Sequence, residues 1–340
     1  MAKHSPLAEI HAELDAKMIP FAGWNMPANY PGGSVAEHKY TRKYCSLFDG
    51  SCCGKIRAAG PGCVPFLAPL AAENIPFPAV GECADTFLFD DNGKLADAVK
   101  ILRMADEDCF IVTSPENTVK VLALLQTKSP SEVSVQDLTD PIARLTLAGP
   151  AARQLLIDAG AEAETVPLSG HCGMTEITDI RCIISSGSVG GEPGFELFCS
   201  ADNVIDLWDE LTCIEPVRPA GISTKESLRI EAGIPAFGQE LTQEFTRADL
   251  SGQENSAQFF IVPVTIEGKT SAVKGSPVFD AAGAEIGVVT SATQAPCLEP
   301  PCALCRLTLF KSPGEKIFIR NAGTELTGTV VQQLYTSAQN

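Results

Sequence analysis

The pattern of apolar residues after Gln258 places the strongest constraint on how this chain can fold. Five short apolar runs follow one another there, at residues 259–266, 286–290, 303–309, 316–319 and 327–331. Gly, Pro or Asp residues separate these runs, and no stretch between them has the periodicity of a helix. Closely spaced strands without intervening helices are typical of an antiparallel barrel or jelly roll. We therefore expect a C-terminal β-barrel.

The first 250 residues carry a different, mixed pattern. Strand-like runs lie at residues 86–89, 99–102, 109–113 and 142–147, and helices are expected at 34–48, 115–126, 150–160 and 202–213. Ser34 with Glu37 three residues later has the form of a capping box, and Ser114-Pro115 that of a cap followed by a first helical proline. The last helix should bury an apolar stripe made of Val204, Leu207, Trp208 and Leu211. These alternating elements predict an α+β fold.

Composition narrows the functional classes. The chain has 340 residues, of which 45% are hydrophobic and 20% charged, as in a globular protein large enough for two or three domains. Its net charge of −17 argues against nonspecific nucleic-acid binding, which needs basic patches. No apolar run is long enough to cross a bilayer, and the N-terminus lacks the apolar segment of a secretory signal. We expect a cytoplasmic protein with neither a membrane nor nucleic acid as a partner.

Thirteen cysteines are many for a cytoplasmic chain. Most lie in apolar stretches, where a free thiol packs as a small hydrophobic group. Two clusters differ, the adjacent Cys52-Cys53 and the pair Cys302-Ala-Leu-Cys305, whose spacing could suit zinc or a redox dithiol. The second pair lies in a strand-like run rather than in a zinc knuckle, and the two clusters are far apart in the sequence. Structural thiols are the favoured interpretation, and no metal site is predicted.

Several sequence blocks, taken in order, carry a family resemblance. The blocks are Phe21-Ala-Gly-Trp-Asn-Met-Pro-Ala-Asn-Tyr30, Glu37-His-Lys-Tyr-Thr-Arg42, Leu147-Ala-Gly-Pro150, Gly191-Glu-Pro-Gly-Phe-Glu-Leu197 and Glu226-Ser-Leu-Arg-Ile-Glu-Ala-Gly233. With them the chain resembles the T-protein family of the glycine cleavage system, the tetrahydrofolate-dependent aminomethyltransferases. The resemblance implies transfer of a one-carbon unit from an aminomethyl group on lipoylated H-protein to tetrahydrofolate, with release of ammonia.

The same resemblance implies a three-domain cloverleaf around a central folate channel. Residues 1–50 and 138–250 would form a discontinuous α+β folate-binding domain. Residues 51–137 would form a second α+β domain, and residues 251–340 the C-terminal β-barrel. The strand pattern after Gln258 agrees with this arrangement independently.

The resemblance also implies folate contacts for four residues. Glu196 matches the family glutamate that grips the polar edge of the pterin, a role suited to a carboxylate that can accept two N–H bonds. Met26 lies in the first block, Lys225 stands where the family has arginine, and Tyr335 matches a tyrosine near the folate. Lysine keeps the charge of arginine but loses its bidentate fork. The alternative for Glu196 is a solvent-facing position on an edge strand.

The position expected to hold the catalytic carboxylate has changed. The family carries Asn-Gly-Gly-x-x-Asp-Asp-Leu, whereas this chain has Asn92-Gly-Lys-Leu-Ala-Asp-Ala-Val99. Asp97 matches the first aspartate, but Ala98 replaces the second, which orients the folate amine. Neighbouring side chains on a strand point to opposite faces, so Asp97 could take over the catalytic role only through a bulge. Otherwise Asp97 would be a solvated turn residue.

Other departures point the same way. Cys52-Cys53 stand where the family has His-Met, Thr113 replaces an asparagine, and Val189 replaces a tyrosine expected near the folate. Together these changes favour altered chemistry on a retained scaffold. Two further hypotheses stand beside the transferase: a folate-binding module with little or no transferase activity, and a related folate-dependent demethylase. Turnover of aminomethyl H-protein with and without tetrahydrofolate would distinguish them.

Overall fold

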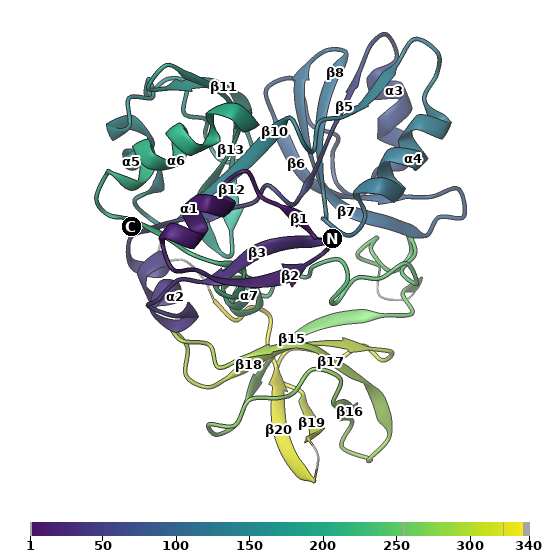
Figure 1. Cartoon of the computed structure of the whole chain (residues 1–340). Coiled ribbons are helices and arrows are strands. Elements are labelled where there is room, and N and C mark those ends of the chain that lie inside the picture. Colours follow the sequence, from purple (N-terminus) through teal and green to yellow (C-terminus); the bar gives the residue numbers. More distant parts are fainter. Residues whose placement is uncertain (1, 254–255, 322, 336–340) are drawn as a thin grey trace. The chain divides into compact units, whose positions relative to one another are not determined.

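The computed structural model describes residues 2–253, 256–321 and 323–335 (Figure 1). The chain divides into two compact units. The first contains Met1–Asn92 and Ala96–Lys225, and the second contains Gly93–Leu95 and Glu226–Asn340. The chain passes from the first unit to the second within helix α7 (Ile222–Glu231). The three-domain boundaries implied by the family resemblance stay a prediction.

A six-stranded sheet forms part of the first unit, with the strand order β11-β12-β13-β10-β4-β14. The strands are β4 (Cys45–Asp49), β10 (Ile142–Ala148), β11 (Cys172–Ile177), β12 (Ile180–Val189), β13 (Glu192–Ser200) and β14 (Val217–Pro219). All neighbours are antiparallel except β14, which runs parallel to β4. One face packs against α5 (Ala152–Asp158) and α6 (Val204–Thr212), which follows the turn η2 (Ala201–Asn203). The predicted apolar stripe of α6 is confirmed, because all four of its residues are buried.

A five-stranded sheet, with the order β6-β7-β8-β5-β9, forms a second layer of the same unit. Its strands are β5 (Gly54–Ala59), β6 (Cys83–Phe89), β7 (Leu95–Ala105), β8 (Asp108–Thr113) and β9 (Ser134–Asp137). Helices α3 (Cys63–Leu67) and α4 (Thr118–Lys128), with η1 (Ala68–Leu70), lie on one side of it (Figure 1). Ile101, Ile111 and Val121 belong to the core between this sheet and its helices.

The other face of the five-stranded sheet meets the six-stranded sheet. Leu102 of β7 and Phe110 of β8 belong to one buried cluster with Phe198 of β13. The rings of Phe110 and Phe198 meet edge to face, with their centroids 5.1 Å apart. Aromatic pairs prefer this arrangement over a face-to-face stack. Side chains on these two facing surfaces are therefore enclosed between the sheets of the first unit.

The N-terminal residues complete the first unit. A three-stranded sheet has the order β1-β3-β2, with β1 (Lys3–His4) parallel to β3 (Trp24–Asn29) and β2 (Lys17–Phe21) antiparallel to it. Helix α1 (Ala8–Glu13) connects β1 to β2, and α2 (Ser34–Lys43) precedes β4. Met26 of β3 is fully buried.

The second unit contains a closed barrel, with the strand order β15-β18-β17-β16-β19-β20. The strands are β15 (Phe260–Ile266), β16 (Pro277–Phe279), β17 (Glu285–Thr293), β18 (Cys302–Leu307), β19 (Lys316–Asn321) and β20 (Thr324–Val330). Every pairing in it is antiparallel. The predicted C-terminal antiparallel barrel is confirmed, and Cys305 packs in its core as a free thiol beside Val264 and Val278.

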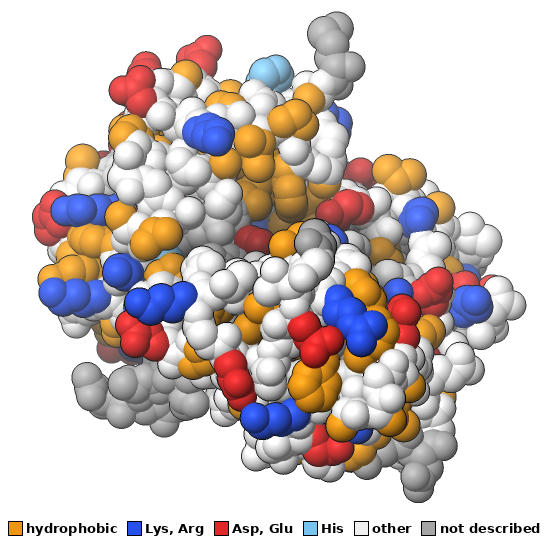
Figure 2. Space-filling view, turned by 90° about the horizontal axis from the view of Figure 1, so that it is seen from below, with side chains coloured by type: hydrophobic (Ala, Val, Ile, Leu, Met, Phe, Trp, Pro, Cys, Tyr) orange, Lys and Arg blue, Asp and Glu red, His pale blue; other side chains and the backbone are white. Residues whose placement is uncertain are grey.

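Among the described residues, no helix is both long and apolar enough to span a membrane. On the face shown in Figure 2, Lys and Arg side chains are interspersed with Asp and Glu.

Two predicted helix starts are wrong. Gly33, at a φ of 76°, stands before α2, so Ser34 is the first helical residue and its side chain caps nothing. Residues 45–48, expected at the end of this helix, belong to strand β4 instead. Helix α4 begins at Thr118 rather than at Pro115, because Ser114 and Asn117 form a turn bound to Asp97. Val119, the second residue of α4, is 79% exposed.

Glu37 was expected to complete a capping box, but its carboxylate instead joins α2 to the nearby Tyr30 and to the distant residues 221–224. It accepts hydrogen bonds from the backbone N–H groups of Tyr30 (2.6 Å) and Gly221 (3.0 Å) and from the Thr224 hydroxyl (2.5 Å). A Cβ at Gly221 would lie 2.2 Å from the carbonyl oxygen of Ala28, so the close approach requires glycine. Hydrogen bonds to a carboxylate are stronger than neutral ones, so this contact should hold the segments firmly.

We expect Glu37→Ala to lower the free energy of unfolding of the first unit by about 3 kcal/mol, because it leaves buried donors without an acceptor. Urea unfolding followed by tryptophan fluorescence measures this effect, since Trp24 and Trp208 both lie in the first unit. The control is Glu13→Ala, at an exposed position of α1, which should change stability by less than about 0.5 kcal/mol. Equal effects of the two variants would contradict the role given to Glu37.

Candidate functional site

Glu196 lies at the centre of a buried polar cluster between the two sheets of the first unit. It is on β13, which is flanked by β12 and β10, so the alternative of a solvent-facing edge strand is wrong. Arg144 of β10 donates a hydrogen bond to one carboxylate oxygen of Glu196. The Nζ atom of Lys100 lies 3.3 Å from the other oxygen, and the Ser185 hydroxyl donates to it over 3.4 Å. Three strands of one sheet and one of the other thus converge on this carboxylate.

The register of the strands explains why these side chains meet. Glu196 pairs directly with Thr146 on β10 and with Ser185 on β12. Paired residues on antiparallel strands project from the same face, and so do residues two positions apart, which adds Arg144. Leu145 and Leu197 alternate with them and enter the opposite, apolar core. The face that carries Glu196 is the one that meets the five-stranded sheet.

The surrounding cations keep Glu196 ionised. Burial by itself would raise the pKa of its carboxyl group, but the nearby charges of Arg144, Lys100 and Lys225 outweigh burial and lower the pKa to about 2. The same pairing with Glu196 raises the pKa of Arg144, although burial opposes that change. At neutral pH the cluster therefore holds a buried carboxylate with a full negative charge.

Basic groups outnumber acidic ones around this carboxylate. Lys55 is fully buried, donates to the Ser51 carbonyl oxygen over 2.8 Å, and has its pKa lowered to about 8 by burial. Burial and the charge of Arg144 lower the pKa of Lys225 as well. Lys55, Lys100, Arg144 and Lys225 thus give a positive potential at one place in a chain that is acidic as a whole. Such a pocket favours a ligand with acidic or electron-rich groups.

Two polar atoms in the cluster lack partners among the described residues. They are Nε of Arg144 and the hydroxyl oxygen of Thr146, both buried. Unsatisfied buried polar groups are rare, and each costs free energy until something binds it. These atoms lie on the face that carries Glu196, so a polar ligand bound there could satisfy them. The carboxylate itself has room for about one further hydrogen bond beyond the three groups around it.

Met26 and Lys225 lie in the same region as Glu196. Met26 is buried in an apolar cluster with Trp24 and Cys52, against which Cys53 also packs. Lys225 is close enough to Cys53 and Glu196 for its charge to act on both. The structure therefore groups three of the four predicted folate contacts in the first unit. Tyr335 belongs to the second unit, where its carbonyl oxygen accepts a hydrogen bond from Gln333, and its role stays a prediction.

Asp97 has different neighbours from Glu196. It is fully buried on β7 and accepts hydrogen bonds from the Ser114 N–H (2.8 Å) and from Nδ2 of Asn117 (3.1 Å). The alternative of a solvated turn residue is wrong. In the pairing of β7 with β8, the register shifts between Arg103 and Ala105, which is not beside Asp97. Alternation along β7 therefore places Ala98 on the face of Lys100 and Asp97 on the other, and a catalytic role of Asp97 stays a prediction.

Sequence reasoning missed Lys55, Lys100, Arg144 and Ser185. The available signal was a single charged residue inside an apolar strand, as in Ile142-Ala-Arg-Leu-Thr-Leu147. A charge at such a position is costly to bury without a partner, so it predicts a buried ion pair. The partner itself depends on which strands become neighbours, and local sequence does not state that.

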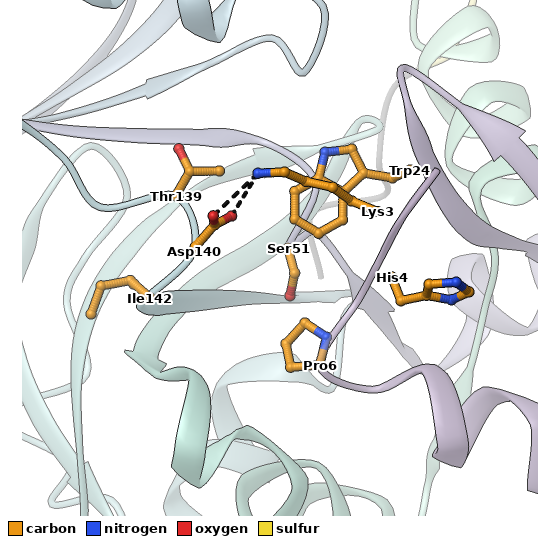
Figure 3. A pocket seen from close by; sticks show the side chains of 8 residues that line it. All are labelled: Lys3, His4, Pro6, Trp24, Ser51, Thr139, Asp140 and Ile142. Carbon is orange, nitrogen blue, oxygen red and sulfur yellow. Dashed lines mark hydrogen bonds and ion pairs between the residues drawn. The ribbon is translucent and has the colours of Figure 1, made fainter. Parts of the chain in front are cut away.

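An open pocket of about 350 Å³ lies in the first unit, next to the turn that carries Cys52 and Cys53 (Figure 3). Its lining residues are Lys3, His4, Pro6, Trp24, Ser51, Thr139, Asp140 and Ile142. Lys3 lines the pocket and pairs with Asp140, with Nζ 2.9 and 3.2 Å from the two carboxylate oxygens. Trp24 lines the pocket and also packs with Cys52, and Ser51 precedes that cysteine in the chain. Solvent in the pocket therefore reaches the residues beside the Cys52-Cys53 turn.

Comparisons with known proteins give one consistent family. The family model described as the GCVT N-terminal domain matches residues 7–252, and the glycine cleavage T-protein C-terminal barrel domain matches residues 261–335. The chain is 31% identical to an aminomethyltransferase of Parafrankia sp., covering 99% of this chain and 98% of that protein. It is 30% identical to one of Saccharopolyspora erythraea, covering 97% and 96%.

A solved structure resembles the whole chain as well. The crystal structure of the glycine cleavage system aminomethyltransferase T from Bartonella henselae superposes with a TM-score of 0.88. The two sequences are 26% identical, and the match covers 98% of this chain and 97% of the other.

Asp97 gives a prediction for the pH dependence of stability. Burial raises the pKa of its carboxyl group to about 6, so the folded chain keeps this proton at pH values where the unfolded chain, with a pKa of about 3.9, has lost it. Stability from this group is thus present below about pH 4 and is lost as the pH rises through 6. Relative to Asp97→Asn, the wild type should lose roughly 2–3 kcal/mol between pH 4 and pH 7. The measurement is urea unfolding at several pH values, and a pH-independent difference would contradict it.

Proposed function

The chain belongs to the glycine cleavage T-protein family of aminomethyltransferases, and from this premise we propose that it binds tetrahydrofolate at Glu196 and transfers to it the one-carbon unit carried by lipoylated H-protein. Ammonia is the second product of this reaction. The cytoplasmic location and the H-protein partner expected from the sequence are parts of the same proposal.

The observation that carries the proposal is a carboxylate held ionised inside the protein by Arg144 and Lys100. The pterin ring presents N–H donors along one edge, and an ionised carboxylate is the acceptor best suited to them. Nε of Arg144 and the hydroxyl of Thr146 lie on the same face without hydrogen-bond partners among the described residues, so a ligand could bind them. The residues present therefore fit a flat ligand with a polar edge.

Each residue has a defined task in this proposal. Glu196 accepts a hydrogen bond from the pterin and fixes its orientation, while Arg144 and Lys100 hold Glu196 in place and keep it charged. Lys225 contributes positive charge near the same ligand, without the two-pronged contact that arginine would give. Met26 supplies an apolar surface. Tetrahydrofolate, when bound, supplies the amine that accepts the one-carbon unit.

Ala98 favours a second candidate, a folate-binding module with little transferase activity. Ala98 shares a strand face with Lys100, whose Nζ contacts Glu196, so a carboxylate at position 98 would point toward the bound folate. Alanine offers no group that can orient an amine or accept a proton there. Tight folate binding with slow transfer would therefore be the behaviour of this module.

The first test concerns binding. Glu196→Gln should weaken tetrahydrofolate binding by about 1.5–3 kcal/mol, because it removes the charge from a hydrogen-bonded carboxylate. The matched control is Glu192→Gln on the same strand, where a buried glutamate lies 2.9 Å from Arg42 and outside the cluster. Isothermal titration calorimetry measures the tetrahydrofolate affinity of both folded variants. Unchanged affinity in Glu196→Gln would remove this residue from the site.

The second test concerns catalysis. If the rest of the pocket is competent, Ala98→Asp should raise the rate of one-carbon transfer by about 10²–10⁴-fold, the usual contribution of an orienting or proton-transferring carboxylate. Ala98→Asn has nearly the same shape without the charge and should not restore the rate. The assay follows ammonia release from aminomethylated H-protein in the presence of tetrahydrofolate. Ordinary turnover by the wild type, roughly 1 s⁻¹ or faster, would show that Ala98 does not limit the reaction.

A further inference from the structure

We propose that Cys52 and Cys53 form a redox-active dithiol, in which Cys53 is the nucleophile that reacts with a peroxide and Cys52 is the thiol that closes a reversible disulfide with it. This proposal does not depend on folate binding or on one-carbon transfer. It rests on the position of this pair among the thirteen cysteines of the chain.

Among the described residues of the first unit, three cysteine pairs have thiols close enough to shift each other's pKa. They are Cys52–Cys53, Cys63–Cys109 and Cys182–Cys199. The residues of the second and third pairs are almost fully buried, in the apolar cores of the two sheets. Cys53 is only half-buried, whereas its partner Cys52 is buried. Cys53 is thus the least buried residue of the three pairs.

The charges around Cys53 favour its thiolate form. The neighbouring Cys52 thiol lowers the pKa of Cys53 first of all, and the charges of Arg144, Lys225 and Lys55 lower it further, against the effect of burial. The same interaction between the two thiols, together with burial, raises the pKa of Cys52. The surroundings of the turn suit the same two roles, because Lys55 donates to the Ser51 carbonyl oxygen and the Arg144 side chain lies against Gly50. Cys53, the less buried residue, is favoured as the thiolate, and the buried Cys52 as the protonated thiol. Reactive cysteines in proteins lie in such electropositive, partly exposed surroundings.

Access to the pair comes from the same region of the first unit. Ser51 and Trp24 line the open pocket of Figure 3, and they adjoin Cys52 in the chain and in the apolar cluster, respectively. The cysteines themselves lie in the turn between β4 and β5, where the Cys53 N–H donates to the Gly50 carbonyl oxygen over 3.0 Å. A turn is easier to adjust than a strand when a ring closes between neighbouring residues.

The proposed reaction balances in two steps. The Cys53 thiolate attacks one oxygen of hydrogen peroxide, so that an S–O bond forms, the O–O bond breaks and the leaving hydroxide takes a proton to become water. The Cys52 sulfur then attacks the Cys53 sulfenic acid, which forms the S–S bond, breaks the S–O bond and releases a second water. The dithiol loses two electrons, and the peroxide gains them. An external dithiol returns the pair to its reduced form by exchange.

Adjacency makes this disulfide different from a structural one. The Cα atoms of neighbouring residues are about 3.8 Å apart, closer than the roughly 4.4–6.8 Å of ordinary disulfides. A disulfide closed between such residues is strained and is therefore easily reduced. Oxidation also removes the negative charge of the Cys53 thiolate from the cation cluster around Glu196.

The experiment uses the full, reduced chain and hydrogen peroxide as the probe. After brief exposure, free thiols are alkylated and tryptic peptides are weighed by mass spectrometry. The peptide of residues 44–55 should lose two hydrogen atoms, with Cys52 and Cys53 protected from alkylation and Cys45 alkylated. Dithiothreitol should reverse the change. Cys63, Cys109, Cys182 and Cys199 serve as internal controls and should stay alkylated, because their pairs are enclosed.

The order of the two steps is tested with single variants. In Cys52→Ser, Cys53 should accumulate as a sulfenic acid that dimedone traps, about tenfold faster than the exposed Cys213, because a thiolate reacts where a neutral thiol does not. In Cys53→Ser, Cys52 should react no faster than Cys213. Equal oxidation of the three thiol pairs in the wild type, or a Cys53 no faster than Cys213, would overturn the proposal. The wild-type comparison keeps the test decisive even if a variant fails to fold.

Discussion

The buried ion cluster of Arg144, Glu196 and Lys100 is the interaction on which the rest of the first unit depends. It draws groups from both sheets to one point, where burial alone would oppose every charge involved. Removing one partner of such a cluster leaves the others buried and uncompensated, which is far more costly than never having built it. Its presence between two apolar faces therefore calls for a reason beyond stability. Binding of a polar ligand would be one, because Arg144 Nε and the Thr146 hydroxyl have no partner among the residues that the structure describes.

Local patterns predicted the elements whose signals are local. The apolar stripe of α6 and the closely spaced strands of the barrel followed from periodicity alone. Helices α3 and α7 were not predicted, since α3 is only five residues long and α7 has a polar, weakly periodic sequence. The start of α4 was misplaced because the Ser114–Asn117 turn is set by Asp97 on another strand. The capping signal at Ser34 was misleading because Glu37 has stronger, distant partners.

The residues of the candidate site also differ in whether local sequence could predict them. Glu196 could be named from the family blocks around it, and its partners could not, since each lies on a different strand. The alternation of strand side chains correctly separated Asp97 from Ala98, because that rule needs no knowledge of the tertiary fold. Predicting which basic residues keep Glu196 charged would have required knowing how both sheets are arranged. The proposed folate site can thus keep its charged residues around Glu196 even though Ala98 stands at the proposed catalytic position.

The contact of Glu37 with Gly221 and Thr224 also has a consequence for the order of folding. Its partners are separated from it by 184 and 187 positions, and β14 joins β4 over a similar distance. Closing so long a loop is slow, and during synthesis it cannot begin until residue 224 has left the ribosome. The five-stranded sheet comes mainly from the continuous stretch 54–137, so it can form before residue 224 has been synthesised. We expect pulse-labelling hydrogen exchange to find it protected first, with the six-stranded sheet completed around it afterwards.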